Sequence, residues 1–203
     1  MSIQKKVVLA SGNPGKLREF SRILADAAHI EIIPQSEFNV SEAVEDGLTF
    51  VENAIIKARH AAQATGLPAL ADDSGIEVDA LNGKPGIYSA RYAGIAGDDE
   101  ANNDLLLTEM AGVPEPERSA RFRCCIVFMR HAEDPSPLIA NASWEGSILF
   151  ERHGDNGFGY DPLFYVPTHQ CSSAELDPDV KNSISHRGIA LRDMLQQLTH
   201  SHS

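Results

Sequence analysis

Short apolar segments alternate with amphipathic segments along the N-terminal third of this chain, and this alternation constrains the fold more than any other feature. Residues 7–10, 30–33 and 68–71 are short and apolar, as expected of buried strands. Between them lie two segments with apolar side chains at helical spacing. An order of strand, helix, strand, helix, strand favours a partly parallel α/β sheet.

The two helical segments contain signals for their position. The apolar face of the first consists of Leu17, Phe20, Leu24 and Ala27. The second begins with a capping box, Thr49-x-x-Glu52, and is expected to end at Gly66 and Pro68. Its apolar stripe comprises Val51, Ala54, Ile55, Ala58 and Ala62. Its polar side chains, which we expect on the opposite face, are Asn53, Lys57 and His60.

The middle of the chain shows a different pattern. Residues 122–129 and 138–144 predict two apolar strands, and the Asp- and Pro-containing segment between them predicts an antiparallel hairpin. One further helix is expected at about residues 100–110, and a last one is indicated by Leu191, Met194, Leu195 and Leu198. The sequence therefore predicts an α/β fold with a mixed, twisted central sheet flanked by helices.

Length and composition limit the class of protein. The chain of 203 residues fits one two-lobed unit, so we expect residues 1–203 to form a single domain with the active-site cleft between its lobes. No apolar run approaches the ~20 residues that a membrane span needs. Residues 7–10 are also too short for the core of a signal peptide. We expect a cytoplasmic protein that does not bind membranes.

Charge and cysteine content limit the partners. A formal net charge of −12 argues against nonspecific nucleic-acid binding, which needs a basic surface. A small phosphorylated substrate remains possible, because a few lysines and a divalent cation create a local positive site. The cysteines, expected to be reduced and mostly buried, are Cys124, Cys125 and Cys171.

A glycine-containing turn between the first strand and the first helix is a candidate phosphate-binding loop. Its sequence is SGNPGK, formed by Ser11, Gly12, Asn13, Pro14, Gly15 and Lys16. The glycines let the backbone approach a ligand, and the helix start offers free N–H groups and partial positive charge. The spacing is not that of a Walker A loop, and an ordinary strand-to-helix turn would have the same pattern.

Two further segments contain residues suited to nucleotide chemistry. Asp72 and Asp73, followed by Ser74 and Gly75, are expected in a loop after the third strand, where they could bind Mg²⁺ or form a solvated turn. Taken singly, Glu45 and Lys57 suggest only solvated charges.

The C-terminal half contains candidate base-binding residues. Phe158, Gly159, Tyr160 and Asp161 place two aromatic rings in a loop where a base could stack, although local turn packing would explain them as well. The segment 185–188 opens the last helix. Its donors could bind a carbonyl oxygen or form surface charges. They are His186 and Arg187, with Lys181 five residues before His186.

Six motifs in fixed order closely resemble the inosine/xanthosine triphosphate pyrophosphatase family. They are SGNPGK, ENAIIKA, ALADDSG, PGIYSARYAG, GFGYDP and SISHRG. The resemblance covers Val7 to Leu195, and Ser11 stands where many relatives have threonine. It implies Mg²⁺-dependent hydrolysis of dITP, ITP and XTP to the monophosphate and pyrophosphate, which cleanses the nucleotide pool. It also implies a homodimer.

The resemblance implies a role for each matching residue. Residues 11–16 would bind the triphosphate, and Lys57 would contact a phosphate. Asp73 would activate water and contact Mg²⁺, with Glu45 as the second metal ligand. The remaining substrate contacts would be Ser74, Phe158, Gly159, Tyr160, Asp161, Lys181, His186 and Arg187.

The residue chemistry fits this mechanism. Asp73 could deprotonate a water that attacks the α-phosphorus, with Mg²⁺ and lysines stabilising the leaving group. Phe158 could stack on the purine, and His186 with Arg187 could donate to a 6-keto oxygen, which adenine lacks. Two rivals are a Maf-like pyrimidine nucleotide pyrophosphatase, whose loop resembles S-x-S-P-R-R, and a nucleotide-sensing module. Two adjacent carboxylates argue against a module that only binds.

Overall fold

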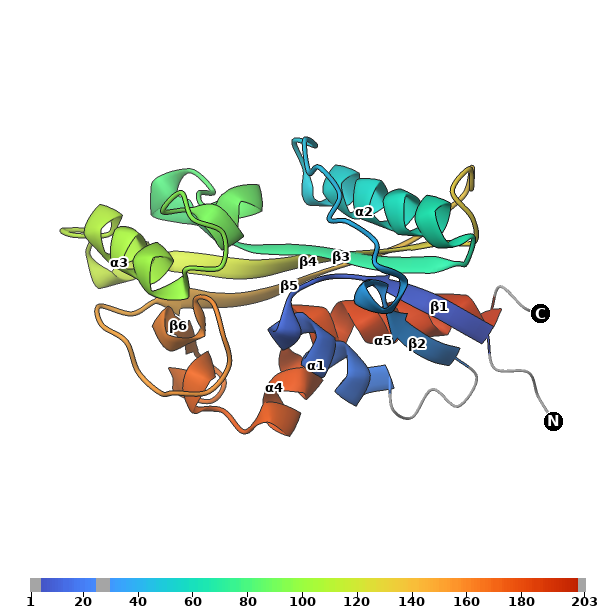
Figure 1. Cartoon of the computed structure of the whole chain (residues 1–203). Helices are drawn as coiled ribbons and strands as arrows, with labels where there is room; N and C mark the ends of the chain where they lie inside the picture. Colours follow the sequence, from blue (N-terminus) through green and yellow to red (C-terminus); the bar gives the residue numbers. More distant parts are fainter. Residues whose placement is uncertain (1–4, 25–29, 201–203) are drawn as a thin grey trace. The chain divides into compact units, whose positions relative to one another are not determined.

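The computed structural model describes residues 5–24 and 30–200 (Figure 1). Within these residues, the strands are β1 (Lys5–Ala10), β2 (Ile30–Pro34), β3 (Ala69–Val78), β4 (Ser119–Met129), β5 (Leu138–Ile148), β6 (Phe164–Val166) and β7 (Cys171–Ser172). The α-helices are α1 (Pro14–Leu24), α2 (Phe50–Thr65), α3 (Asp99–Glu109), α4 (Pro178–Ile184) and α5 (His186–His200). Ala27, predicted on the face of the first helix, lies outside the described residues.

The strands form one mixed sheet in the order β2-β1-β3-β4-β5-β6-β7 within the described part of the chain. Strand β1 pairs in parallel with both β2 and β3, while β6 pairs antiparallel with β5 and β7. The predicted α/β class with a mixed sheet is therefore confirmed. Strands β4 and β5 are neighbours in the sheet, as the predicted hairpin requires, and both are longer than their apolar cores suggested.

The chain divides into two compact units, each with its own core. Unit 1 contains Met1–Asp73, Cys124–Ala142 and Arg187–Ser203, and unit 2 contains Ser74–Arg123 and Ser143–His186. Strands β3, β4 and β5 contribute residues to both. A single domain with a cleft between two lobes stays a prediction. Among the described residues, no helix combines the length and the apolar character needed to cross a membrane.

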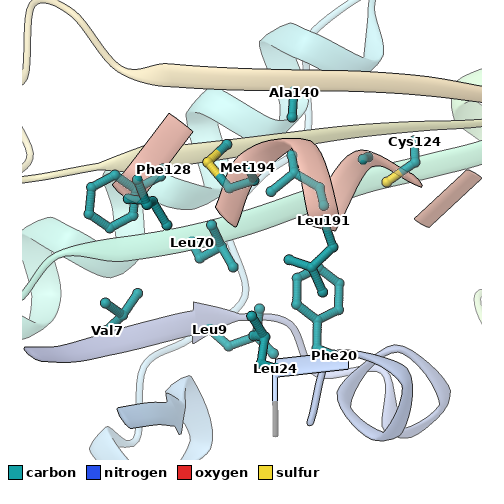
Figure 2. Close-up of a cluster of buried hydrophobic side chains, with 13 residues drawn as sticks. Val7, Leu9, Phe20, Leu24, Leu70, Cys124, Phe128, Ala140, Leu191 and Met194 are labelled. Atoms are coloured by element: carbon teal, nitrogen blue, oxygen red, sulfur yellow. The ribbon is translucent and has the colours of Figure 1, made fainter. Parts of the chain in front are cut away.

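In unit 1, side chains alternate between the two faces of the sheet, because successive strand residues point in opposite directions. On one face, α1 and α5 pack on the strands, and Leu191 and Met194 of α5 lie over them (Figure 2). On the other face, α2 packs through small side chains: Ala54, Ala58, Ala61 and Ala62. The neighbours Cys124 and Cys125 lie in these two different clusters. The described cysteines are all free thiols, and Cys124 and Cys125 are buried.

Helix α2 begins where its capping box predicted. The Thr49 hydroxyl accepts a hydrogen bond from the N–H of Glu52 at 3.2 Å, and Gly66 ends the helix with a φ of +68°. Asn53, expected on the face opposite the apolar stripe, is fully buried. Its Oδ1 accepts the N–H of Gly47 at 2.9 Å and so holds the preceding loop against the helix.

Strand β3 is longer than the sequence predicted, and it includes residues that were expected in a loop. Asp72, Asp73, Ser74 and Gly75 do not form a loop, because β3 runs through them without interruption to Val78. Ile76 and Val78 are completely buried and continue the strand on its far side. Cationic side chains on both faces of the sheet compensate the buried carboxylates of Asp72 and Asp73. The strand can therefore continue through these polar residues.

Unit 2 has an aromatic core around β4, β5 and β6. Its largest buried side chains include Phe122, Trp144, Tyr160 and Phe164. Helix α3 contributes Leu106 and ends one residue before Met110, close to its predicted limits. The last predicted helix is also confirmed, since α5 opens at His186 within the segment 185–188.

Candidate functional site

The loop of residues 11–13 connects β1 to α1, as the phosphate-loop prediction requires. Asn13 caps the helix, because its Oδ1 accepts the N–H of Lys16 at 3.0 Å. Pro14 is the first helical residue, where its missing N–H costs no hydrogen bond. The end of the exposed Glu42 side chain lies close to Gly12, since a Cβ there would lie 2.2 Å from Oε1 of Glu42. The loop thus combines close backbone approach with the N-terminus of α1.

Asp72 points to the face of the sheet that α1 and α5 cover, where it is surrounded by cations. Its Oδ1 lies 2.5 Å from Nζ of Lys16, and its Oδ2 lies 3.3 Å from Nε of Arg187. Burial raises the pKa of the Asp72 carboxyl, but Lys16, Arg187 and Lys57 outweigh it and hold the pKa well below its usual range. Arg187 also pairs with Glu19 of α1. These cations therefore favour the ionised form of Asp72 within unit 1.

Asp73 points to the opposite face, toward α2. Its Oδ1 accepts a hydrogen bond from Nζ of Lys57 at 2.7 Å. Its Oδ2 is buried and has no hydrogen-bond partner among the described residues. Burial raises the pKa of Asp73 more than the nearby Lys57 lowers it, and Glu45 raises it further. One oxygen of Asp73 is thus fixed, while the other is left for a ligand.

Lys57 connects Asp73 to the loop before α2. Its Nζ also lies 3.4 Å from Oε2 of Glu45. Burial lowers the pKa of Lys57, but Asp73, Glu45 and Asp72 outweigh this effect and raise it. The structure therefore brings together Glu45, Lys57 and Asp73, which are far apart in the sequence. The buried Asn53 supports the arrangement by holding Gly47, two residues after Glu45.

These carboxylates fit a divalent cation with oxygen ligands. Oδ2 of Asp73 is buried and has no hydrogen-bond partner among the described residues. Glu45 and Asp73 both form ion pairs with the ammonium group of Lys57, so their carboxylates lie close together. Mg²⁺ is usually bound by one or two carboxylates together with substrate phosphates and waters. No group of three or more His, Cys, Asp or Glu in residues 5–24 and 30–200 is arranged to hold a metal without such help. The donor set therefore suits a metal that arrives with a phosphorylated ligand.

The aromatic loop of unit 2, residues 157–161, is organised by Asp161. The Asp161 carboxylate accepts hydrogen bonds from the N–H of Phe158 at 2.8 Å and from Oγ of Ser173 at 2.8 Å. It also accepts one from Nζ of Lys181 at 2.6 Å. A Cβ at Gly157 would lie 2.0 Å from Oδ2 of Asp161, and its φ is +83°. The loop therefore packs tightly around one buried carboxylate.

The Phe158 ring has a cation beside it. Nζ of Lys181 lies 5.2 Å from the ring centroid, within the range of a cation–π interaction. The ring is half-buried. The next residues are fixed by hydrogen bonds, because the Tyr160 hydroxyl donates to the carbonyl of Ser89 at 2.8 Å. A half-buried phenylalanine with an ammonium over its ring has the chemistry of a base-stacking residue.

His186 and Arg187 are buried rather than forming surface charges at the helix start. In unit 2, the His186 ring stacks on Phe122, with ring centroids 4.8 Å apart and planes 10° apart. In unit 1, Arg187 is 3% exposed and contacts Asp72 and Glu19. The alternative of solvated surface charges is therefore wrong for both residues.

Comparison with known proteins identifies the family. A model of the Ham1 family matches residues 7–197. The chain is 60% identical over 195 residues to a dITP/XTP pyrophosphatase of Vibrio parahaemolyticus serotype O3:K6, covering 96% of this chain and 97% of that protein. The chain belongs to the Ham1 family. The family resemblance indicated by the six ordered motifs is thus confirmed.

Solved structures show the same fold. A HAM1 protein from Coxiella burnetii has a TM-score of 0.89 and 52% identity, covering 97% of this chain and 100% of that chain. The Ham1 protein of Staphylococcus aureus has a TM-score of 0.85 and 41% identity, with the same coverage. The mixed sheet described above is therefore the Ham1 fold.

The predicted site residues of this Ham1 chain form three groups. In the first group, Lys16 and Arg187 form ion pairs with Asp72. In the second, Lys57 forms ion pairs with Glu45 and Asp73. In the third, which lies in unit 2, Asp161 accepts a hydrogen bond from the N–H of Phe158 and forms an ion pair with Lys181. Ser74 is half-buried within β3, and His186 lies in the aromatic core. The role of each toward a ligand stays a prediction.

Five residues that support these groups were not predicted. They are Glu19, Asn53, Asp99, Asn103 and Ser173. Each is a polar residue within or beside a helix, where sequence alone suggests solvent exposure. A partial signal exists for Asp99 and Asn103, because they are four positions apart and helical geometry places both on one face.

Proposed function

We propose that this Ham1 chain hydrolyses non-standard purine nucleoside triphosphates, namely dITP, ITP and XTP, to the monophosphate and pyrophosphate with the help of Mg²⁺. Its relatives include proteins named dITP/XTP pyrophosphatase that match nearly its full length. The observation that carries the proposal is the arrangement at Asp73. One oxygen of Asp73 is fixed by Lys57, and the other is buried and has no hydrogen-bond partner among the described residues.

In the proposed reaction, Oδ2 of Asp73 accepts a proton from water, and the resulting hydroxide attacks the α-phosphorus. The bond between this phosphorus and the bridging oxygen breaks, and pyrophosphate leaves with the electron pair. Lys57 holds Oδ1 of Asp73, so Oδ2 is the oxygen that can receive the proton. Bound Mg²⁺, held by Asp73 and Glu45, would neutralise charge on the phosphates.

The phosphate chain is assigned to unit 1. Residues 11–16 offer backbone N–H groups at the start of α1, where the helix dipole favours an anion. Lys57 contributes a cation from α2. Lys16, which pairs with Asp72, is proposed to contact the phosphates from α1. These groups would stabilise charge that develops on the leaving pyrophosphate.

The base is assigned to the residues of the aromatic loop and of the start of α5. Phe158 would stack on the purine, with Lys181 beside its ring. His186 and Arg187 are proposed to donate to the 6-keto oxygen of hypoxanthine or xanthine. Adenine has an amino group at this position, so buried donors would be left unpaired, and such a mismatch can discriminate by several powers of ten. Ser74, Gly159, Tyr160 and Asp161 complete the proposed substrate contacts.

One assay tests this function. The purified chain is incubated with Mg²⁺ and dITP, XTP, ATP or dTTP, and pyrophosphate is separated from orthophosphate. We expect pyrophosphate and monophosphate from dITP and XTP, little product from ATP, and no turnover when EDTA removes the metal. Release of orthophosphate and a diphosphate would overturn the choice of bond. A preference for dTTP would favour a pyrimidine nucleotide pyrophosphatase instead.

A further inference from the structure

Two residues of α3 hold the backbone of the aromatic loop. The N–H of Gly159 donates to Oδ2 of Asp99 at 2.7 Å, and Nδ2 of Asn103 donates to the carbonyl of Gly159 at 2.8 Å. Nδ2 of Asn103 also donates to the carbonyl of Asp99 at 2.7 Å, which ties the two together. Asn103 is 2% exposed, so its hydrogen bonds form away from water. We call Asp99 and Asn103 the α3 clamp.

The clamp acts at a glycine with a left-handed backbone conformation. Gly159 has a φ of +62°, and a Cβ built there would meet no heavy atom within 4 Å. Glycine has wider backbone freedom than any other residue, so hydrogen bonds are needed to restrain the two peptide planes around Gly159. The hydrogen bonds to the clamp fix one group in each plane. These hydrogen bonds therefore restrain the backbone conformation directly after Phe158.

The orientation of the Phe158 ring depends on these planes. On its N-terminal side, the N–H of Phe158 is fixed by Asp161. On its C-terminal side, the plane between Phe158 and Gly159 is fixed by Asp99, whose charge strengthens the hydrogen bond. The same plane is also held by the N–H of Asp161, which donates to the carbonyl of Phe158 at 3.3 Å. Loss of the clamp would remove the shorter, charge-assisted hydrogen bond and leave only this longer one. The ring would then sample a wider range of orientations beside Lys181.

We propose that Asp99 and Asn103 are positioning residues that preorganise Phe158 for the purine base, and so contribute to substrate affinity and base selectivity. This inference rests on the proposed function, because it assigns the Phe158 ring to the base. Neither residue would contact the reacting phosphates. Their loss should therefore weaken binding of the base without changing the chemical step.

The test compares Asn103→Leu and Asp99→Ala with two controls on the same helix. Glu100→Ala removes a neighbouring carboxylate of the first turn, and Asp104→Ala removes an exposed carboxylate that pairs with Arg152. If the Phe158 ring adopts its binding orientation for only about one fifth of the time without the clamp, KM for dITP should rise about fivefold in each clamp variant. We expect kcat to change less than about twofold, because only uniform binding is lost. Both controls should keep the wild-type KM.

A second measurement separates positioning from a general structural role. Asn103→Leu is combined with Phe158→Ala, and KM is measured in both backgrounds. If the clamp acts through the ring, Asn103→Leu should have no further effect once the ring is removed. The preference for dITP over ATP should fall in the single clamp variants. An equal rise in KM in both backgrounds, or an unchanged preference, would overturn the inference.

Amide hydrogen exchange tests the clamp without any substrate. The N–H of Gly159 should be protected in the wild type and should exchange at least about tenfold faster in Asp99→Ala, which loses its acceptor. The smaller variant Asn103→Ser serves if Asn103→Leu does not fold. Unchanged protection in the clamp variants would contradict the inference even if turnover differed. Failure of the proposed function would show in the wild type instead, as absence of pyrophosphate release from dITP.

Discussion

Two adjacent aspartates behave in opposite ways because they lie on opposite faces of one strand. Asp72 lies among Lys16 and Arg187, which hold its pKa far below the usual range. Asp73 has a raised pKa, because burial outweighs the attraction of Lys57. The expectation that the two carboxylates crowd one site was wrong, since strand geometry separates them. Substitution of the two should therefore have different consequences.

Asp73→Asn should remove activity and leave the fold intact. The amide is nearly isosteric but cannot accept the proton of the attacking water, and general-base catalysis typically contributes 10²–10⁴-fold. We expect kcat for dITP to fall by at least about a hundredfold, with an unchanged circular dichroism spectrum. A kcat near that of the wild type would exclude Asp73 as the base.

Asp72→Asn should primarily reduce stability. Lys16 and Arg187 would lose a buried anionic partner, and breaking a buried ion pair on one side typically costs about 3–5 kcal/mol. We expect the free energy of unfolding, measured with urea, to fall by about this amount. Asp73→Asn is the matched control, because it changes the neighbouring carboxylate of the same strand. Equal losses of stability in both variants would contradict the assigned roles.

At the scale of elements, an exposed ion pair links the end of β3 to β4. Asp79 follows β3 and accepts hydrogen bonds from both terminal nitrogens of the Arg121 guanidinium, at 2.7 and 2.8 Å. Ser119 donates to the same carboxylate at 2.7 Å. Hydrogen bonds from Arg121 and then from Ser119 lower the pKa of Asp79 from 3.8 to about 2. The link therefore depends on pH.

The contribution of Asp79 should be complete above its unfolded-state pKa and disappear in acid. Because its folded-state pKa is depressed, the stabilisation is present above pH 3.8 and is lost as the pH falls toward 2. We expect Asp79→Asn to cost about 1 kcal/mol at pH 7, since the pair is screened by solvent, and almost nothing at pH 2. Urea unfolding at both values measures this. Asp155→Asn, at an exposed site, should show no such difference.

At the scale of the whole molecule, family membership follows from a match that spans nearly the full chain. The two compact units have separate cores, and each contains one part of the proposed machinery. Unit 1 holds the residues assigned to phosphate and metal, and unit 2 holds Phe158, Lys181 and His186. Action in the cytoplasm and assembly as a homodimer stay predictions drawn from the sequence.

A measurement of mass tests the predicted homodimer. The chain has a mass of 22.0 kDa, and light scattering of the purified protein should give twice this value. The measurement should be repeated over a range of protein concentrations, because association follows mass action. A mass of one chain at all concentrations would contradict the prediction.

Much of the fold and several site residues could be predicted because their signals are local. The capping box located the start of α2, and apolar periodicity located most helices and strands. The extent of β3 could not be predicted, because polar residues end a strand unless partners from elsewhere compensate them. The clamp residues Asp99 and Asn103 were missed for the same reason, since their partner Gly159 lies more than fifty residues away.

The sequence by itself determined the α/β class, the positions of most elements and the family, because periodicity, caps and ordered motifs are properties of short segments. The tertiary structure decided which charges meet. It separated Asp72 from Asp73, joined Glu45 and Lys57 to Asp73, and turned Arg187 inward onto Asp72 and Glu19. The reason is that the partner of a buried charge comes from a distant segment, and only the packed chain fixes which segment that is.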